Sequence, residues 1–228
     1  MSVPPEAISI LLVVAVSALL VLTGLRRQPG LGVLGSVTVI ALAYWLRGNT
    51  IADIGLSPPA NWAATLLLAL GLGVVIQLLT VAVIEPLTER IAGDAHDHSA
   101  FRFVKKSWKG FLQMMVLVWV AVVFLEEGIY RGFLMTELAS LIGTGWGAST
   151  LNVLITSAVF GLSHGYQNRC GVLSTGVVGA MLGGIVVLSG FNLWLAIFTH
   201  GFINTVGIGL IAVEGDTYLR RMIWRSRG

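Results

Sequence analysis

Residues 111–142 read FLQMMVLVWVAVVFLEEGIYRGFLMTELASLI, and this apolar run of 32 residues decides the fold. A straight helix of that length would measure about 48 Å, whereas the hydrocarbon core of a bilayer is about 30 Å thick. The run is therefore long enough to cross a membrane and too long to do so as one upright helix. It is one of several such runs, so we predict that the chain is embedded in a membrane.

The composition of the whole chain supports this prediction. Of 228 residues, 56% are hydrophobic and 11% are charged, and the mean hydropathy is +0.87. Seven spans of about 20 residues would use roughly 140 residues and leave roughly 88 for all loops and tails. A soluble catalytic domain does not fit into that remainder. Any chemistry must therefore come from side chains within the bilayer or at its edge.

Seven apolar runs have the character of membrane spans, which predicts an all-α, polytopic helix bundle. The runs lie at about residues 7–25, 31–46, 62–84, 111–142, 149–164, 171–189 and 191–212. We treat residues 1–228 as one membrane domain. Within it we expect N-terminal spans and a loop over 1–100, a helical core over 110–212, and a basic tail over 213–228.

Basic residues gather at the ends of the runs, so the net charge of +3 indicates topology and not nucleic-acid binding. With the N-terminus outside and the C-terminus in the cytoplasm, Arg47 is the only basic loop residue that faces outward. A composition rich in Ala, Val, Gly and Trp fits a bacterial inner membrane. The inward-facing basic residues are Arg26, Arg27, Arg90, Arg102, Lys105, Lys106, Lys109, Arg169 and the arginines of the tail.

The segment before the fourth run invites two interpretations. Residues 101–115 place apolar side chains at spacings of three and four, with basic side chains on the other side. This pattern predicts an interfacial amphipathic helix on the cytoplasmic surface. Just before it, Asp94, His96, Asp97 and His98 resemble a metal-binding tract. Alternate spacing in a flexible loop fixes no ligand geometry, so we interpret the tract as a solvated acidic turn.

Few polar residues remain inside the runs, and two neighbouring glutamates have different surroundings. Glu127 and Arg131 are four residues apart, in the favourable order for a helical ion pair. Glu126 projects about 100° away from that pair and has no local cation. Desolvation makes an unpaired carboxylate more basic, which favours Glu126 as a general base. We expect Glu137 to extend to the outer interface.

Histidines on two later helices complete a candidate site. His164 follows Phe160 by four residues and shares its helix face. His200 and Asn204 are also four residues apart, and such a pair forms either an oxyanion stabiliser or a hydrogen-bonded clamp between helices. A carboxylate, two imidazoles and an amide from three helices form the pattern of an active site inside a bundle.

Three motifs occur in order on successive apolar helices. Glu126-Glu127-Gly-Ile-Tyr-Arg131 fits EExxxR, Phe160-Gly-Leu-Ser-His164 fits FxxxH, and His200-Gly-Phe-Ile-Asn204 fits HxxxN. Over residues 110–212 the chain resembles the CAAX protease and bacteriocin-processing (CPBP, or Abi) family of intramembrane endopeptidases. That family includes the type II CAAX prenyl endopeptidases. Tyr130 departs from its pattern, because a phenylalanine commonly precedes the arginine.

The resemblance implies roles for the motif residues. It implies that Glu126 and His164 activate a water molecule, that His200 and Asn204 stabilise the oxyanion, and that residues 127 and 131 support the site. Zinc held by Glu126, His164 and His200 is the alternative, because two imidazoles and one carboxylate can form an open zinc site. We favour a glutamate mechanism without a cofactor, because Asn204 beside His200 suits an oxyanion hole.

The sequence thus predicts a membrane protease that cleaves a peptide bond near the cytoplasmic membrane face. The expected substrate is a peptide or protein, lipidated, membrane-anchored or bacteriocin-like. The sequence contains no HExxH, GxGD or GxSG motif of other intramembrane proteases. An ion- or proton-coupled transporter and a non-proteolytic membrane scaffold are the alternatives. A transporter is less favoured, because the chain shows no inverted repeat and its intramembrane polar residues lie in the C-terminal half.

Overall fold

A computed structural model describes residues 4–214, which contain helices and no strand. The predicted tail over 213–228 lies outside the described residues from residue 215 onward. The α-helices are α1 (Pro5–Leu25), α2 (Pro29–Arg47), α3 (Trp62–Leu79), α4 (Glu85–Ala92), α5 (Trp108–Leu117), α6 (Val123–Glu127), α7 (Met135–Ile142), α8 (Trp146–Ser163), α9 (Asn168–Leu188) and α10 (Trp194–Ala212). The 3-10 helices are η1 (Ile51–Ile54), η3 (Ser99–Val104) and η6 (Gly165–Gln167), and the π-helices are η2 (Thr80–Ile84), η4 (Val118–Val122) and η5 (Gly128–Leu134).

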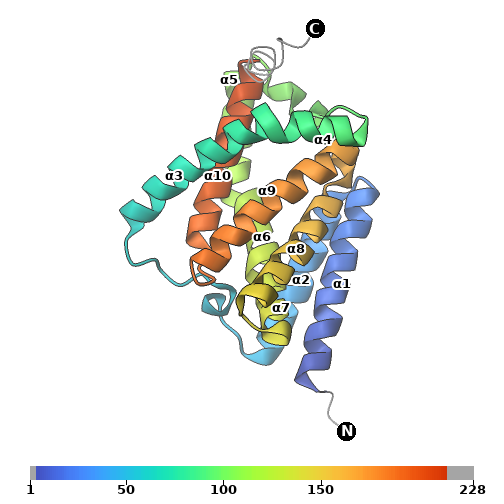
Figure 1. The fold of residues 1–228 in the computed structure, drawn as a ribbon, viewed down its shortest axis with the longest axis vertical. Coiled ribbons are helices and arrows are strands. Elements are labelled where there is room, and N and C mark those ends of the chain that lie inside the picture. Colours follow the sequence, from blue (N-terminus) through green and yellow to red (C-terminus); the bar gives the residue numbers. More distant parts are fainter. Residues whose placement is uncertain (1–3, 215–228) are drawn as a thin grey trace.

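Seven helical segments of the described chain are long and apolar enough to cross a membrane, which confirms the predicted all-α membrane bundle. Two of them unite several elements. Trp62–Ala92 joins α3 to α4 through η2, and Trp108–Ile142 joins α5, α6 and α7 through η4 and η5. The protein is therefore an integral, multi-pass membrane protein (Figure 1).

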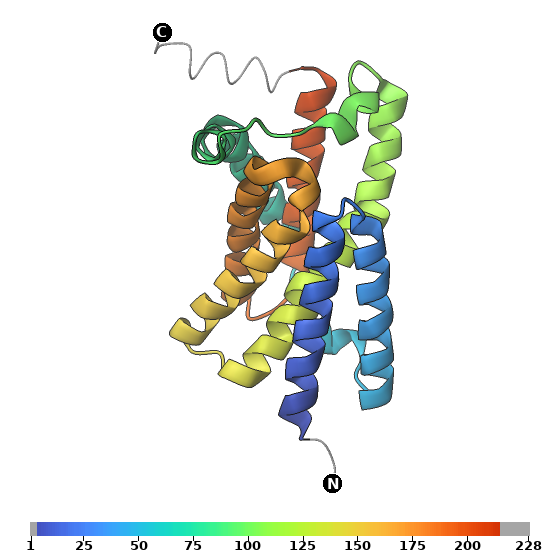
Figure 2. The ribbon, with the colours of Figure 1, turned by 90° about the vertical axis from the view of Figure 1, so that its right-hand side faces the viewer.

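The 35-residue segment Trp108–Ile142 is not straight. In Figure 2 its first part runs alongside α10, and its last part runs obliquely beneath the neighbouring helices. Two π-helical segments lie between these parts, and insertions of this kind are a common cause of helix bending. A bent path explains how so long an apolar run remains continuous.

The predicted amphipathic helix over residues 101–115 is wrong. Ser99–Val104 is a 3-10 helix, and Lys106 adopts a left-handed backbone conformation with φ 54°. The backbone N–H of Lys106 donates to the Ala212 carbonyl at the end of α10, at 3.0 Å. Ser107 then caps a new helix, because its hydroxyl accepts from the Gly110 N–H at 3.0 Å. The sequence has the apolar periodicity, but the Lys106 hydrogen bond and the Ser107 cap divide the segment between a 3-10 helix and α5.

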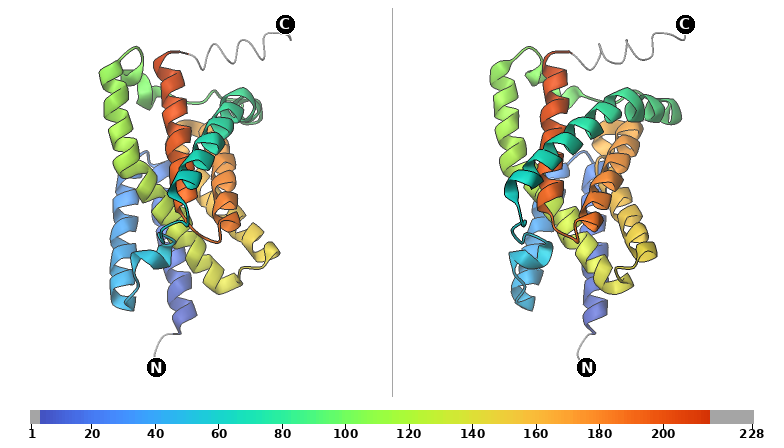
Figure 3. Two further views of the ribbon diagram at one scale, coloured as in Figure 1. Left: turned by 90° about the vertical axis from the view of Figure 1, so that its left-hand side faces the viewer. Right: turned by 60° about the vertical axis from the view of Figure 1, so that its left-hand side comes forward.

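Close helix contacts hold the bundle together. Helix α3 crosses α10 obliquely, as both views of Figure 3 show. Gly73 makes this crossing possible, since a Cβ there would lie 2.5 Å from Cβ of Phe202. Helices α8 and α9 approach similarly, and a Cβ on Gly161 would lie 2.6 Å from the Val172 carbonyl oxygen. Small residues at such crossings are typical of helices packed in lipid.

Glu137 does not extend to the interface as expected. Its side chain is buried and accepts a hydrogen bond from Nη1 of Arg47 at 2.6 Å. Arg47 is the last residue of α2, and Glu137 lies in the first turn of α7. The ion pair therefore joins two elements toward the end of the bundle where α1 begins (Figure 2).

Candidate active site

One carboxylate faces two imidazoles at the centre of the candidate site. Oε1 of Glu126 lies 4.0 Å from Nε2 of His164, and Oε2 lies 3.8 Å from Nε2 of His200. Glu126 is on α6, His164 follows the last residue of α8, and His200 is on α10. His164 and His200 follow Glu126 by 38 and 74 positions in the sequence, and both meet its carboxyl group in the fold.

The orientation of His164 follows from its second ring nitrogen. Nδ1 lies 2.8 Å from the Phe160 carbonyl oxygen, which can only accept a hydrogen bond. Nδ1 therefore carries a proton, and Nε2 is the nitrogen that faces Glu126. The Phe160 ring packs against the imidazole with 4.6 Å between ring centroids. The four-residue spacing of FxxxH thus holds the histidine through both the backbone and the ring of Phe160.

His200 is oriented by Glu127 in a similar way. Its Nδ1 lies 2.7 Å from Oε1 of Glu127, so the nitrogen donates to the carboxylate. Nε2 then faces Glu126. A carboxylate that fixes a histidine tautomer and presents the other nitrogen to the reacting group is a recurrent device of hydrolytic sites. The two neighbouring glutamates therefore contact opposite sides of one imidazole.

The predicted ion pair between Glu127 and Arg131 is confirmed. Nη1 of Arg131 lies 3.0 Å from Oε1 of Glu127, and both side chains are almost completely buried. Nη2 of Arg131 donates to the Gly179 carbonyl at 3.0 Å. A Cβ on Gly179 would lie 2.9 Å from a ring carbon of Phe160, so glycine is needed for this approach. Arg131 therefore connects α9 to the carboxylate that orients His200.

Tyr130 is hydrogen-bonded through its hydroxyl to the last residue of α8. The hydroxyl donates to Oγ of Ser163 at 2.6 Å, and Ser163 donates in turn to the Phe160 carbonyl at 2.7 Å. The ring of Tyr130 also packs edge-on against Phe160. Sequence reasoning gave Ser163 no role, although its position next to His164 was a usable signal. The extra hydroxyl of Tyr130 thus fastens the turn that carries His164.

Trp119 is a second residue that the sequence did not bring to notice. Its indole N–H donates to Oγ1 of Thr205 at 3.0 Å. The ring covers Gly201, where a Cβ would lie 2.3 Å from the indole. This contact holds η4 against α10 one residue away from His200. An isolated tryptophan in an apolar run has no spacing pattern, so only the fold reveals its partner.

A cavity of about 590 Å³ contains the site. Glu126, His164, His200 and Asn204 all line it, and Asn204 lies one helical turn after His200. Its walls are mainly apolar side chains of α2, α5 and η4, including Val33, Met114, Leu117, Val118 and Ala121. The cavity continues to the loop at residues 96–99. The site is therefore buried in the bundle and reached from the end where this loop lies.

Fold and site together define a multi-pass membrane protein with an acid–histidine site inside its helix bundle. Residues 108–206 match the family described as type II CAAX prenyl endopeptidase Rce1-like. The matched segment contains all three motifs, and it confirms the resemblance to CAAX proteases. Comparisons with curated proteins and with solved structures gave no match. Residues 108–206 are thus similar to an Rce1-like domain, and this similarity indicates a protease that acts on a peptide or protein.

Proposed function

We propose that this protein is an intramembrane endopeptidase in which Glu126 and His164 activate the attacking water. The position of Glu126 beside two imidazole nitrogens, at 4.0 and 3.8 Å, is the observation that carries the proposal. Both distances exceed a direct hydrogen bond, so one water molecule can contact the carboxylate and an imidazole together. The match to an Rce1-like protease domain supports hydrolysis of a peptide bond.

The chemical steps follow from the available donors and acceptors. Glu126 takes a proton from water while Nε2 of His164 holds it, and the water oxygen attacks the peptide carbonyl. The resulting oxyanion accepts hydrogen bonds from the Asn204 amide and from His200. His200 can donate from Nε2 when both ring nitrogens are protonated, while Nδ1–H remains bound to Glu127. Glu126 then delivers its proton to the departing amine, which completes hydrolysis.

The same donor set also fits a divalent metal ion. His164 and His200 present Nε2, and each Nδ1 is held by a carbonyl or carboxylate, as is usual for metal-bound histidines. With Glu126 they would supply two nitrogens and one oxygen, and a bound metal would make water more acidic. We favour the metal-free mechanism, because Asn204 on the same face as His200 is a suitable oxyanion donor.

We further propose that the substrate is a lipidated or membrane-anchored peptide, cleaved near the cytoplasmic face of a bacterial inner membrane. The apolar walls of the cavity suit a lipid chain, and Glu126, His164 and His200 supply polar groups in its interior. The N-terminus would lie outside and the C-terminus inside, because basic loop residues favour the cytoplasmic side. This orientation places the loop-bearing end of the cavity at the cytoplasmic face.

The function can be tested with the full-length protein reconstituted in lipid vesicles. We expect it to cleave C-terminally lipidated peptides into two fragments that mass spectrometry identifies, while protein-free vesicles produce none. An unmodified peptide of the same sequence is the matched substrate control, and slower cleavage of it would support lipid recognition. Proton or ion flux through sealed vesicles, with no cleavage of any peptide, would contradict the protease assignment and favour a transporter.

Replacing Asn204 with alanine is expected to lower kcat by about 10²–10³-fold and to change KM little, because an oxyanion donor acts mainly in the transition state. Thr175→Val is a matched control. Thr175 also lines the cavity, but its hydroxyl donates to the Gly171 carbonyl at 2.6 Å. Initial rates at several peptide concentrations separate the two constants. If kcat is unchanged in the Asn204→Ala variant, His200 and Asn204 form a hydrogen-bonded clamp between helices and do not stabilise an oxyanion.

A further inference from the structure

The tract Asp94–His98, which the sequence suggested to be a solvated acidic turn, is a loop whose two acidic side chains make defined hydrogen bonds. Asp94 is fixed to the start of α9, where its carboxylate accepts from the N–H groups of Cys170 and Arg169 at 3.0 and 3.3 Å. Asp97 accepts from the Ser99 N–H at 2.8 Å. The two acidic side chains therefore hold the shape of the loop. The loop in turn positions His96, which lies between them, and His98, which follows Asp97.

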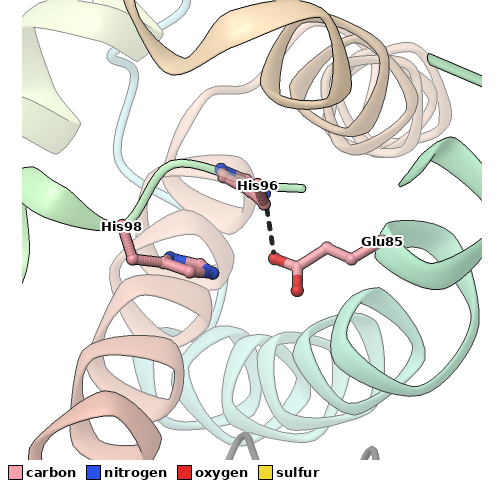
Figure 4. A group of neighbouring side chains, drawn as sticks. All are labelled: Glu85, His96 and His98. Atoms are coloured by element: carbon pink, nitrogen blue, oxygen red, sulfur yellow. Dashed lines mark ion pairs between the residues drawn. The ribbon is translucent and has the colours of Figure 1, made fainter. Parts of the chain in front are cut away.

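Those histidines meet a buried carboxylate from another element. Ligand atoms of Glu85, His96 and His98 all lie within 4.8 Å of one another (Figure 4). Nδ1 of His96 lies 3.3 Å from Oε1 of Glu85, yet this buried nitrogen makes no hydrogen bond of normal geometry. The imidazoles of His96 and His98 stack with 4.5 Å between ring centroids. Three metal-binding groups thus converge, and of the two ring nitrogens of His96 Nε2 is hydrogen-bonded to Gln167 whereas the buried Nδ1 has no hydrogen-bond partner among the described residues.

We propose that Glu85, His96 and His98 bind a divalent transition-metal ion of the zinc class. Two imidazole nitrogens and one carboxylate oxygen suit Zn²⁺ and leave a fourth position for water or another ligand. Oε1 of Gln167 lies 3.3 Å from Nε2 of His96, so the side chain of Gln167 contacts the proposed site. Binding requires the side chains to close slightly, because zinc–ligand bonds are about 2.0–2.2 Å.

The proposed site is separate from the proposed catalytic centre, although both lie on one cavity. Glu85, His96 and His98 line the end of the cavity near the loop, whereas Glu126 and His200 line its interior. The two ends are connected through Gln167, whose N–H donates to the His164 carbonyl at 2.9 Å. A bound ion would therefore hold the loop against α4 and fix the turn that follows His164.

Metal binding by the purified full-length protein in detergent tests the proposal, with Co²⁺ as the spectroscopic probe and Zn²⁺ as its competitor. We expect His98→Gln to weaken binding by at least about 100-fold, because one of three protein ligands is lost. Glu85→Gln serves as a second ligand variant. The thermal unfolding temperature should rise with Zn²⁺ in the wild-type protein and not in these variants. The metal-free variants should unfold close to the metal-free wild type, which shows that they fold.

Two control variants separate this site from its alternatives. Asp97→Asn keeps an acceptor for Ser99 and should bind the ion as the wild type does. His164→Gln should also retain binding of one metal ion at this site. If the wild-type protein binds a second metal ion that only the His164→Gln variant loses, that second ion belongs to the catalytic centre. The proposal is overturned if His98→Gln binds normally, if Asp97→Asn loses binding equally, or if His164→Gln abolishes all binding. These results do not depend on peptide cleavage, so the proposed protease activity is tested independently.

Discussion

Replacing Glu126 with glutamine is expected to reduce peptide cleavage by about 10³-fold, because general-base catalysis typically contributes 10²–10⁴-fold and an amide cannot take the proton. The substitution keeps the size of the side chain. About 17% of the Glu126 side chain is exposed to the cavity, and its contacts with both imidazoles are longer than hydrogen bonds. We therefore expect a folded, inserted protein with almost no activity.

Initial cleavage rates in vesicles, at equal amounts of inserted protein, measure this effect. Glu137→Gln is the matched control, because Glu137 lies on the same bent segment and pairs with Arg47 outside the cavity. It should retain most of the activity. If the Glu126 variant cleaves a verified substrate at the wild-type rate, Glu126 is not the base.

Replacing Glu127 with leucine is expected to lower the free energy of unfolding by about 3–5 kcal/mol, because it leaves a buried arginine without its counter-ion. Arg131 is only 2% exposed, so water cannot replace the lost carboxylate. The change also removes the acceptor for Nδ1 of His200. Denaturant titration of the protein in detergent measures the loss, and an unfolding midpoint equal to that of the wild type would contradict it.

The double variant Glu127→Leu/Arg131→Leu separates stability from catalysis. Removing both charges avoids an uncompensated buried ion, so the double variant should recover a large part of the lost stability. Activity should not recover with it, because His200 still lacks the acceptor that fixes its orientation. Recovery of both together would mean that Glu127 acts only through folding.

The spans could be predicted from sequence because lipid imposes one dominant rule. Every backbone polar group in the bilayer must be hydrogen-bonded, so an apolar run of sufficient length has to be helical. The pair of Glu127 and Arg131 could be predicted for a similar reason, since residues four apart on a helix lie side by side. Both inferences depend on local geometry alone.

Contacts between distant segments could not be predicted in this way. His200 meets Glu127 across 73 positions, and no spacing within either helix indicates that partner. Glu85 and His98 belong to different elements, so the loop tract alone could not indicate a third ligand. The helix over 101–115 failed because apolar periodicity does not report the left-handed residue Lys106 or the cap at Ser107.

The π-helical segments η4 and η5 have a consequence for how this protein tolerates change. A π turn holds more residues than an α turn, so each segment alters the phase of the helix around α6. The direction of Glu126 and Glu127 therefore depends on how many residues each segment contains as well as on which residues they are. Apolar substitutions in these segments leave that count unchanged, whereas inserting or deleting one residue would turn both carboxylates away from their partners. Near the centre of the segment Trp108–Ile142, the number of residues is therefore expected to matter more for the site than the identity of the apolar side chains.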